Sequence, residues 1–531
     1  MMVLFHVPMR WYDWGWLEEG GIEVNALQIF GFSSVVFFGA FAGFFLMVSS
    51  TSNMISMYKN LKKGRSPFTV ARLQVMGGAV LLLAAILVES IIGYHGYLGE
   101  VVLGNPERWD MILWRGFHME TIHTIAFCIM INGVVQGLLS LRGGAKKPFR
   151  NMRIYAFLAL LCLFLTVPVY EGLRALQPGY PSSEWHSSLA GRDIEVQYAV
   201  IGESSLPEIL LKALMMPLGG NPEPIFPFLA VSFIGSIIGI YLCIGRADPD
   251  FIKKGIIVSL GALITGTLGL VLTIAGGHAS IDLLLDNFYQ VPNLYPSLWL
   301  WWFLMLTGTQ LVFLLLIIRL VEFRGIGSRF AECTTSLRRF GFVAFTVYTF
   351  QFIDVIPRLL LQLVPCVGDM YPYPAKLSFF LILVMMPLTM LWWELVLRIW
   401  ERFGYVGGME WIIGKIAQTL IPDKKGPLTV KAPWWRVKRL DPGEYFYGPE
   451  WVDLEKAGAS SDEDSRLALK LSIAGLVFFP LSLISFFISI SSRKSEGRNR
   501  HNTAALVLSV AGMLLFSLLM VILFLIDGIG L

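Results

Sequence analysis

RLQVMGGAVLLLAAILVESIIGYHG, residues 72–96, begins with an arginine, continues as a long apolar run and ends in a glutamate and a histidine. A helix needs ~20 mainly apolar residues to cross the hydrocarbon of a bilayer, and this run is long enough. The rest of the chain extends the pattern: 55% of the residues are hydrophobic, 15% are charged, and the mean hydropathy is +0.64. These values predict an all-α protein, a polytopic integral membrane helical bundle.

We expect about eleven transmembrane helices, each marked by an apolar run. They lie near residues 26–48, 72–92, 118–141, 154–173, 224–244, 256–277, 295–318, 340–364, 377–400, 467–490 and 503–527. The apolar segment 205–218 is too short to cross, and we expect it to lie flat or to re-enter. Glycines within 259–277 indicate that this helix packs closely on another helix.

Basic residues gather in alternate loops. Loops 59–72 and 142–153 each carry five Lys or Arg, and loop 319–339 carries five Arg against two Glu, whereas the intervening loops are acidic. The positive-inside rule then places the N-terminus outside the cytoplasm and predicts a protein of the cytoplasmic membrane. By simple counting, the basic loop 491–502 would also lie outside. Either 404–421 contains a further crossing, or the C-terminal helices do not follow the rule.

Changes in composition divide the chain into four parts. The Trp-rich segment 1–25 is expected to lie at the bilayer interface, because amphipathic aromatic rings prefer that position. Residues 26–435 form the membrane core, 436–466 a polar connector, and 467–531 a C-terminal transmembrane hairpin. The five cysteines are scattered singly, which argues against a disulfide framework or a zinc site. The net charge of +4 lies mostly in short loops, so no nucleic acid is expected as a partner.

Ionisable side chains form one layer toward the predicted outer ends of the helices. Such groups are costly inside a membrane and usually face the bundle interior or a water-filled cavity. Glu89 has the strongest claim to a function, because it is a carboxylate within an apolar run. His95 is equally well explained as a residue of a wet loop, and Asp354 and Arg358, spaced i,i+4, as a structural ion pair. The layer contains Glu89, His95, Arg115, His118, Glu120, His123, His278, Asp354 and Arg358.

The stretch HMETIH, residues 118–123, suggests a metal site, but its spacing does not fit one. On a helix with ~100° per residue, the two histidines lie about 140° apart, and His118 and Glu120 about 160° apart. A zinc-protease motif needs histidines at i,i+4. We therefore expect no metal, and instead a pair on one face in which Glu120 orients the imidazole of His123.

Four stretches, in order along the chain, resemble helices of the transmembrane acyltransferase superfamily. Residues 72–96 resemble its first core helix, and GVVQGLLSLR (133–142) resembles its "FxFLFGxGxxLxxxR" helix. FGFVAFTVYTFQFI (340–353) resembles the "G-x-x-(A/S)-L-T-x-Y-L-x-Q-S" helix, and FGYVGGMEWIIGKIAQTLI (403–421) is similar to the "yGPxEWxxRxxT" motif of the YeiB-like membrane proteins. The superfamily includes heparan-α-glucosaminide N-acetyltransferase, and the resemblance covers roughly residues 70–421.

The resemblance implies transfer of an acyl group from cytoplasmic acyl-CoA, with acetyl-CoA as the first choice, to an extracytoplasmic acceptor such as a glycan or lipid-linked sugar. His95 matches the family's histidine, the catalytic base or acyl acceptor, and Glu89 stands where the family has asparagine. From the residues themselves, Glu120 and His123 also suit acid–base work. Oxyanion or substrate binding is assigned to Tyr94, Arg115, His118, His278, Asp354 and Arg358. Binding of acyl-CoA is assigned to Arg72, Asn132, Gln136, Arg339, Thr346, Tyr348 and Gln351.

Two other functions remain open. A carrier or flippase for a polar head group would use the same charged layer, but no internal repeat supports it. A non-catalytic subunit or scaffold of a larger complex is favoured by the absence of the family's "LDxxRG" entry after Arg72. The expected partners are membrane lipids, a small-molecule or glycan acceptor, and a second copy or another subunit of a membrane complex.

Overall fold

The computed structural model describes residues 2–12, 42–94, 96–103, 116, 118–176, 205–244, 249–288, 290–323, 333–420, 463–476 and 479–529. Over these residues the chain is helical, and the β-structure is confined to two isolated bridges, Tyr12 with Leu377 and Met119 with Pro222. The prediction of an all-α fold is confirmed. The chain divides into two compact units, one built mainly from residues 36–455 together with the N-terminal helix, the other containing residues 456–531.

Seven stretches of helix in the described part of the first unit are long and apolar enough to cross a membrane. Seven predicted spans coincide with them, so the polytopic membrane class follows from length and composition. They contain α5 (Pro67–Leu87, continued by a π-helix at Val88–Ile92 and by α6, Tyr97–Leu103), α8 (Thr121–Ser140, continued by a 3-10 turn at Leu141–Lys146), α9 (Pro148–Leu176), α12 (Ile225–Leu242), α13 (Pro249–Ala275), α15 (Trp299–Ile318) and α21 (Phe379–Glu401).

The predicted span 340–364 is not one continuous helix, and that expectation is wrong. The segment is divided among α17 (Thr335–Phe342), α18 (Ala344–Thr349), a 3-10 turn (Gln351–Asp354) and α19 (Val355–Gln362), followed by α20 (Pro365–Met370). The cause lies far along the chain: the carboxylate of Glu410 accepts the backbone N–H groups of Phe345 and Thr346, at 2.6 and 3.2 Å. Those donors occupy the first turn of α18, so a new helix begins there.

Shorter helices complete the first unit. These are α1 (Met2–Trp11), α11 (Leu206–Gly219), α14 (Ile281–Asp286), a 3-10 turn (Val291–Leu294), a π-turn (Arg319–Phe323) and α22 (Met409–Leu420). α22 has 12 residues. At ~1.5 Å per residue, the described part of this helix is shorter than a membrane crossing requires. α4 (Ala42–Lys62) begins within the first predicted span, most of which lies outside the described residues.

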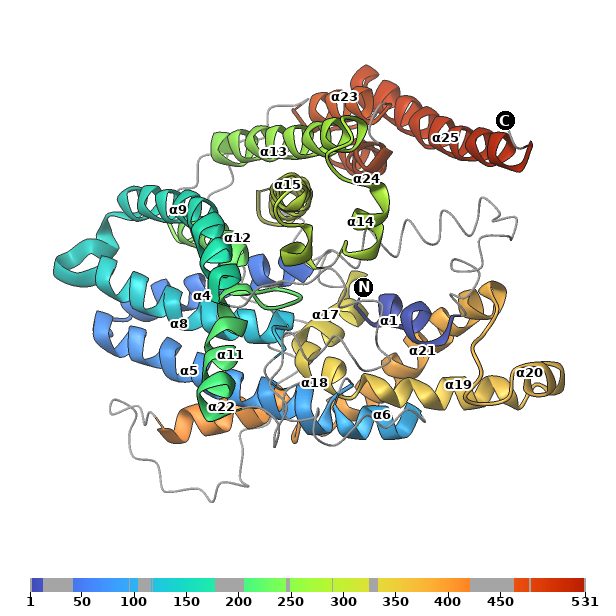
Figure 1. Cartoon of the computed structure of the whole chain (residues 1–531). Helices are drawn as coiled ribbons and strands as arrows, with labels where there is room; N and C mark the ends of the chain where they lie inside the picture. Colours follow the sequence, from blue (N-terminus) through green and yellow to red (C-terminus); the bar gives the residue numbers. More distant parts are fainter. Residues whose placement is uncertain are drawn as a thin grey trace. The chain divides into compact units, whose positions relative to one another are not determined.

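The long helices pack in pairs, α5 on α8, α13 on α15, and α12 on both α4 and α9 (Figure 1). Glycines set the distance between α13 and α15. A Cβ added to Gly308 would lie 2.6 Å from the backbone nitrogen of Leu263, and one added to Gly266 would lie 2.6 Å from the carbonyl oxygen of Trp301. The close packing predicted from the glycines of 259–277 is confirmed.

The N-terminal helix α1 belongs to the packed core of the first unit rather than to its edge. α1 packs along α21, and Val3 lies in a buried cluster with Trp393, Leu397 and Tyr405. After α1, the backbone of Leu377 donates to the carbonyl of Trp11 at 2.6 Å. These contacts bring the first residues of the chain to segments more than three hundred residues away.

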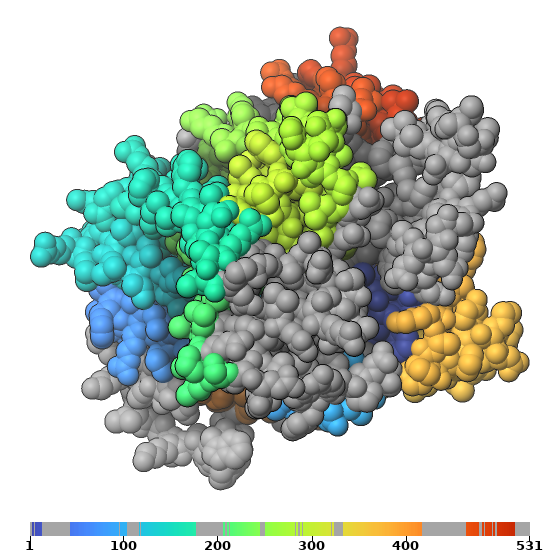
Figure 2. All heavy atoms as spheres, viewed as in Figure 1, coloured from blue at the N-terminus to red at the C-terminus, as the bar shows by residue number. Residues whose placement is uncertain are grey.

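Large apolar side chains cover outward faces of several long helices. On α9, teal in Figure 2, Phe164 is 76% exposed and Phe157 is 63% exposed. On α13, Leu272 and Val258 are exposed to a similar degree, and so is Leu83 on α5. Exposed apolar surface of this extent is unfavourable in water and suits contact with lipid.

The second unit contains three described helices, α23 (Glu463–Gly475), α24 (Phe479–Ser495) and α25 (Arg500–Ile529), and each packs on the other two. The predicted span 467–490 is therefore divided between α23 and α24, which corrects the expectation of one helix. Glu496 caps α23, because its carboxylate accepts the backbone N–H groups of Asp464 and Ser465 at 2.8 and 3.1 Å.

Candidate functional site

Four separate stretches meet around α1 in the first unit and bring polar side chains together. They are α1 itself, the π-helix after α5 with the residues that directly follow it, α18, and the 3-10 turn before α19. Two of these are interruptions of regular α-helix, and such interruptions often occur at functional sites. We call the side chains that meet there the polar cluster: His6, Arg10, Glu89, Tyr94, Tyr348, Gln351 and Asp354.

Glu89 is paired with Tyr348. The phenol of Tyr348 donates to Oε1 of Glu89 at 2.6 Å, and both residues are buried. The carboxylate that has no partner in its own apolar run thus obtains one from a residue 259 positions later. A charge-assisted hydrogen bond of this kind offsets the cost of burying the carboxylate.

His6 is the imidazole at the centre of the polar cluster. Its Nδ1 lies 2.7 Å from Oε1 of Gln351, and its ring stacks on Tyr94 with centroids 4.9 Å apart. Because the amide oxygen of Gln351 accepts, Nδ1 carries the proton and Nε2 carries the lone pair of the neutral ring. Burial lowers the pKa of His6 to about 4, against the opposing effect of the hydrogen bond to Gln351. The imidazole is therefore neutral near pH 7.

Arg10 forms a buried ion pair with Asp354. Nη1 of Arg10 lies 2.5 Å from Oδ1 of Asp354, and the guanidinium carbon lies 3.9 Å from the centroid of the Tyr94 ring. The predicted i,i+4 pair between Asp354 and Arg358 is wrong, because Arg358 points elsewhere: its Nη2 donates to the carbonyls of Tyr371 and Ala375, at 2.9 Å each. The i,i+4 spacing was compatible with a pair, but Asp354 pairs instead with Arg10 of α1.

The predicted pair of Glu120 and His123 is also wrong. Helix α8 begins at Thr121, and residues 118–120 are not helical, so the angular argument does not apply to them. Nδ1 of His118 lies 3.2 Å from Glu120, whereas Nε2 of His123 lies 2.7 Å from the carbonyl oxygen of Gly116. The extended backbone at Met119 is held by Asn221 and Glu223, through hydrogen bonds of 3.0 Å each. Glu120 still acts electrostatically on His6 from the edge of the polar cluster.

The residues assigned to acyl-CoA lie in several separate networks. Asn132 donates to Ser232 at 2.7 Å, Gln136 donates to Ser140 at 2.9 Å, and Arg339 forms ion pairs with Glu394 and Glu401 at 2.8 and 2.7 Å. Tyr348 and Gln351 belong to the polar cluster, and Thr346 binds Glu410. Arg72 on α5 and His278 after α13 are exposed. Arg115 and His95 lie outside the described residues, although His95 directly follows Tyr94.

Contact between Thr346 and Glu410 joins residues 340–353 and 403–421, two stretches that lie far apart in the sequence. The Thr346 hydroxyl donates to Oε2 of Glu410 at 2.5 Å and accepts the backbone N–H of Met409 at 2.7 Å. Burial raises the pKa of Glu410, against the opposing hydrogen bonds from Thr346 and Phe345. The contact fixes α22 against α18, next to the polar cluster.

His6 and Arg10 were not predicted as site residues, although the sequence contains a signal for them. They are spaced i,i+4 in VLFHVPMRW (3–11), an otherwise apolar stretch, and ionisable residues in such a stretch usually face an interior partner. In the predicted interfacial segment, charged side chains would contact water and would need no partner within the protein. Within the described ranges, no group of three or more His, Cys, Asp or Glu side chains could hold a metal ion.

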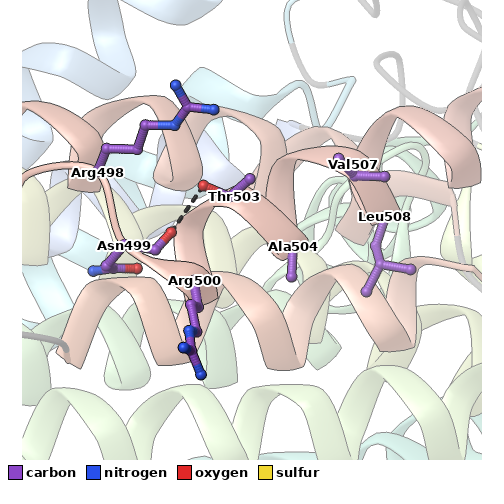
Figure 3. Close-up of a pocket in the computed structure, with 7 residues that line it drawn as sticks. All are labelled: Arg498, Asn499, Arg500, Thr503, Ala504, Val507 and Leu508. Atoms are coloured by element: carbon purple, nitrogen blue, oxygen red, sulfur yellow. Dashed lines mark hydrogen bonds between the residues drawn. The ribbon is translucent and has the colours of Figure 1, made fainter.

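A separate pocket of about 820 Å³ lies in the second unit (Figure 3). It contains none of the predicted site residues. Arg498, Asn499, Arg500 and Thr503 line it at the start of α25, and Ala504, Val507 and Leu508 continue the lining along the helix.

No protein-family model, curated protein or solved structure matches this chain. The function must therefore be inferred from the residues themselves.

Proposed function

We propose that this chain is an integral membrane acyltransferase that moves an acyl group from cytoplasmic acyl-CoA to an extracytoplasmic acceptor. The observation that carries the proposal is the neutral imidazole of His6, held by Gln351 and stacked on Tyr94. The Tyr348–Glu89 hydrogen bond lies beside it, since the rings of His6 and Tyr348 are 6.5 Å apart. A partly buried imidazole next to a phenol and a carboxylate is unusual in so apolar a chain and is typical of a reactive site.

Acyl transfer requires a base and a set of hydrogen-bond donors. The acceptor hydroxyl or amine loses its proton to the base and attacks the thioester carbonyl. The carbon–sulfur bond then breaks, and the CoA thiolate leaves and takes a proton. His6, with Nε2 as its basic nitrogen, and His95 are the two candidate bases. Tyr94 and Tyr348 are the nearest donors for the developing oxyanion.

Acyl-CoA, with acetyl-CoA as the first choice, would approach from the cytoplasmic side, where the basic loops are predicted to lie. Its phosphates match the surface of Arg72, which is exposed near the start of α5. The acceptor, a glycan or lipid-linked sugar, would reach the polar cluster from the opposite side. This arrangement requires the orientation with an extracytoplasmic N-terminus that the loop charges predict.

The test is an assay on the purified full-length protein in liposomes, with radiolabelled acetyl-CoA and release of free CoA as a second signal. We expect His95→Ala and His6→Asn each to lower the rate by about 10²-fold or more, as loss of a general base does. His501→Ala is the control, because this histidine lies on α25 in the second unit and was assigned to no site. A wild-type protein that neither transfers the acyl group nor hydrolyses acetyl-CoA would reject the proposal.

A second candidate function is that of a non-catalytic subunit of a membrane complex. One observation favours it: the ionisable groups of the polar cluster are largely paired with each other, Arg10 with Asp354 and Tyr348 with Glu89. Paired groups of this kind can serve to specify the fold. Under this proposal, the variants at His6 and Glu89 change thermal stability, and the protein co-purifies with a partner from its native membrane.

A further inference from the structure

Hydrogen-bond donors outnumber acceptors among five buried residues, three of which also belong to the polar cluster. We call them the arginine cluster: Arg10 and Trp11 of α1, Gln351 and Asp354 of the 3-10 turn, and Arg358 of α19. None of them is more than 7% exposed. A buried polar group normally has a hydrogen-bond partner, so an excess of one kind of group calls for an explanation.

The unmatched atoms are almost all donors. Among the described residues, no hydrogen-bond partner exists for Nε and Nη2 of Arg10, for Nε and Nη1 of Arg358 or for Nε2 of Gln351, whereas the indole of Trp11 interacts with the carboxylate of Asp354. Against them stands one unmatched acceptor of the cluster, Oδ2 of Asp354. A ligand that fits this cluster must therefore supply acceptors, and several of them.

The cations of the arginine cluster are held in place by contacts with neighbouring groups. The guanidinium carbon of Arg358 lies 5.7 Å from the centroid of the Trp11 ring, and Nη1 of Arg10 lies 2.5 Å from Asp354. Two backbone carbonyls fix Nη2 of Arg358. A third cation is close, since Nζ of Lys376 donates to the carbonyl oxygen of Arg10 at 2.6 Å.

We propose that the arginine cluster binds a phosphate group. The unmatched Nε and Nη2 of Arg10 form the side edge of its guanidinium, which is the edge that binds an oxyanion through two parallel hydrogen bonds. A phosphate offers three strong acceptor oxygens, which suits an excess of donors spread over two arginines and the amide of Gln351. The acceptors of Glu89 and Glu120 face Tyr348 and His118 instead.

The phosphate can come from a lipid headgroup or from a soluble molecule, and both share the chemistry that the cluster recognises. The inference goes beyond acyl transfer and does not depend on it, because binding can be measured without acyl-CoA. A protein that binds phosphate but transfers no acyl group would reject the proposed function and leave this inference intact.

The experiment uses the full-length protein and two probes. In detergent micelles, inorganic phosphate is titrated and the affinity is measured by calorimetry and by the rise in melting temperature that a ligand of the native state produces. In phosphatidylcholine nanodiscs with and without dioleoyl phosphatidic acid, retained lipid is counted by native mass spectrometry. Binding in the first arm indicates a soluble source, and binding in the second arm alone indicates a lipid.

Two variants test the assignment. Arg358→Gln removes a charged donor and is expected to weaken binding by about tenfold or more. Trp11→Phe keeps an aromatic ring in the core and removes the indole N–H beside Asp354. It is expected to weaken binding a few-fold, and it serves as the test variant if Arg358→Gln does not fold. The matched control is Arg174→Gln, because Arg174 also donates to a backbone carbonyl and lies 4.6 Å from the centroid of the Tyr295 ring, yet is partly exposed.

We expect the control to bind as the wild type does. No binding of either probe by the wild-type protein would overturn the inference and would mean that water satisfies the donors. Equal binding by the wild type, Arg358→Gln and Trp11→Phe would also overturn it, because the phosphate would then lie elsewhere.

Discussion

Nη1 of Arg10 donates to Oδ1 of Asp354 at 2.5 Å, and the two residues are 344 positions apart in the chain. Both are buried, and the Tyr94 ring covers the guanidinium. This ion pair connects the first helix of the chain to the 3-10 turn before α19. It therefore determines where the polar cluster is assembled.

Removal of one partner of this ion pair should be strongly destabilising. Asp354→Asn leaves the guanidinium of Arg10 buried without its counter-charge, and we expect a loss of about 3–5 kcal/mol in the free energy of unfolding. Denaturant unfolding in detergent micelles measures the loss. Arg398→Gln is the control: Arg398 also pairs with a carboxylate, Glu394, but its side chain is 64% exposed. Its loss should cost less than about 1 kcal/mol, and equal losses in the two variants would contradict the account.

The interruption at residues 343–344 depends on Glu410. Glu410→Gln keeps the size of the side chain but removes the charge that caps the first turn of α18, so we expect a loss of about 1–2 kcal/mol in the free energy of unfolding. Thr346→Val should cost a similar amount. Because the two residues contact each other, the double variant should cost less than the sum, with a coupling of at least about 0.5 kcal/mol. Strict additivity would show that the 2.5 Å contact contributes nothing.

Close packing of α13 on α15 requires a glycine at position 308. A Cβ there would lie 2.6 Å from the nitrogen of Leu263 and 2.7 Å from the carbonyl oxygen of Ser259, and backbone atoms cannot give way easily. We expect Gly308→Ala to cost about 1–3 kcal/mol in the free energy of unfolding. Gly261→Ala provides the matched control on α13, since no atom lies within 4 Å of its added Cβ. That change should be neutral or stabilising, by up to about 1 kcal/mol, and a reversed order of the two variants would refute this packing.

Stability should depend on pH through Glu223. Burial raises the pKa of its carboxyl group to about 8 from 4.5, against the opposing hydrogen bond from Thr121. The folded protein holds this proton more tightly than the unfolded chain, so the contribution to stability is complete below pH 4.5 and is lost as the pH rises through about 8. We expect the melting temperature to fall by several degrees across that window.

Glu223→Gln removes this titration, so its melting temperature should change less over the same pH range. The comparison of the two curves, rather than either alone, isolates Glu223 from the other titrating groups. Parallel curves for the wild type and the variant would show that the carboxyl group ionises normally in the folded protein.

Much of the fold could be predicted from local sequence. Seven spans follow from runs of apolar residues, and the close packing of α13 follows from its glycines. The candidate site was only partly predictable. Glu89 was selected as a functional carboxylate within an apolar run, and its hydrogen-bond partner, Tyr348, was assigned to the separate role of binding acyl-CoA. The pairs proposed from spacing, Asp354 with Arg358 and Glu120 with His123, were both wrong because each assumed a partner on the same helix.

The sequence by itself determined that this is a membrane protein, and it determined the approximate length of most of the membrane-spanning helices. Both properties follow from the hydropathy of residues that are neighbours in the chain. Only the tertiary structure decided which polar groups meet. Arg10 pairs with Asp354, His6 with Gln351, and Glu410 ends one helix and caps the next at residues 343–346. Such choices follow from which segments lie within a few ångströms of each other, and hydrogen bonds between distant residues leave no periodic trace in the chain.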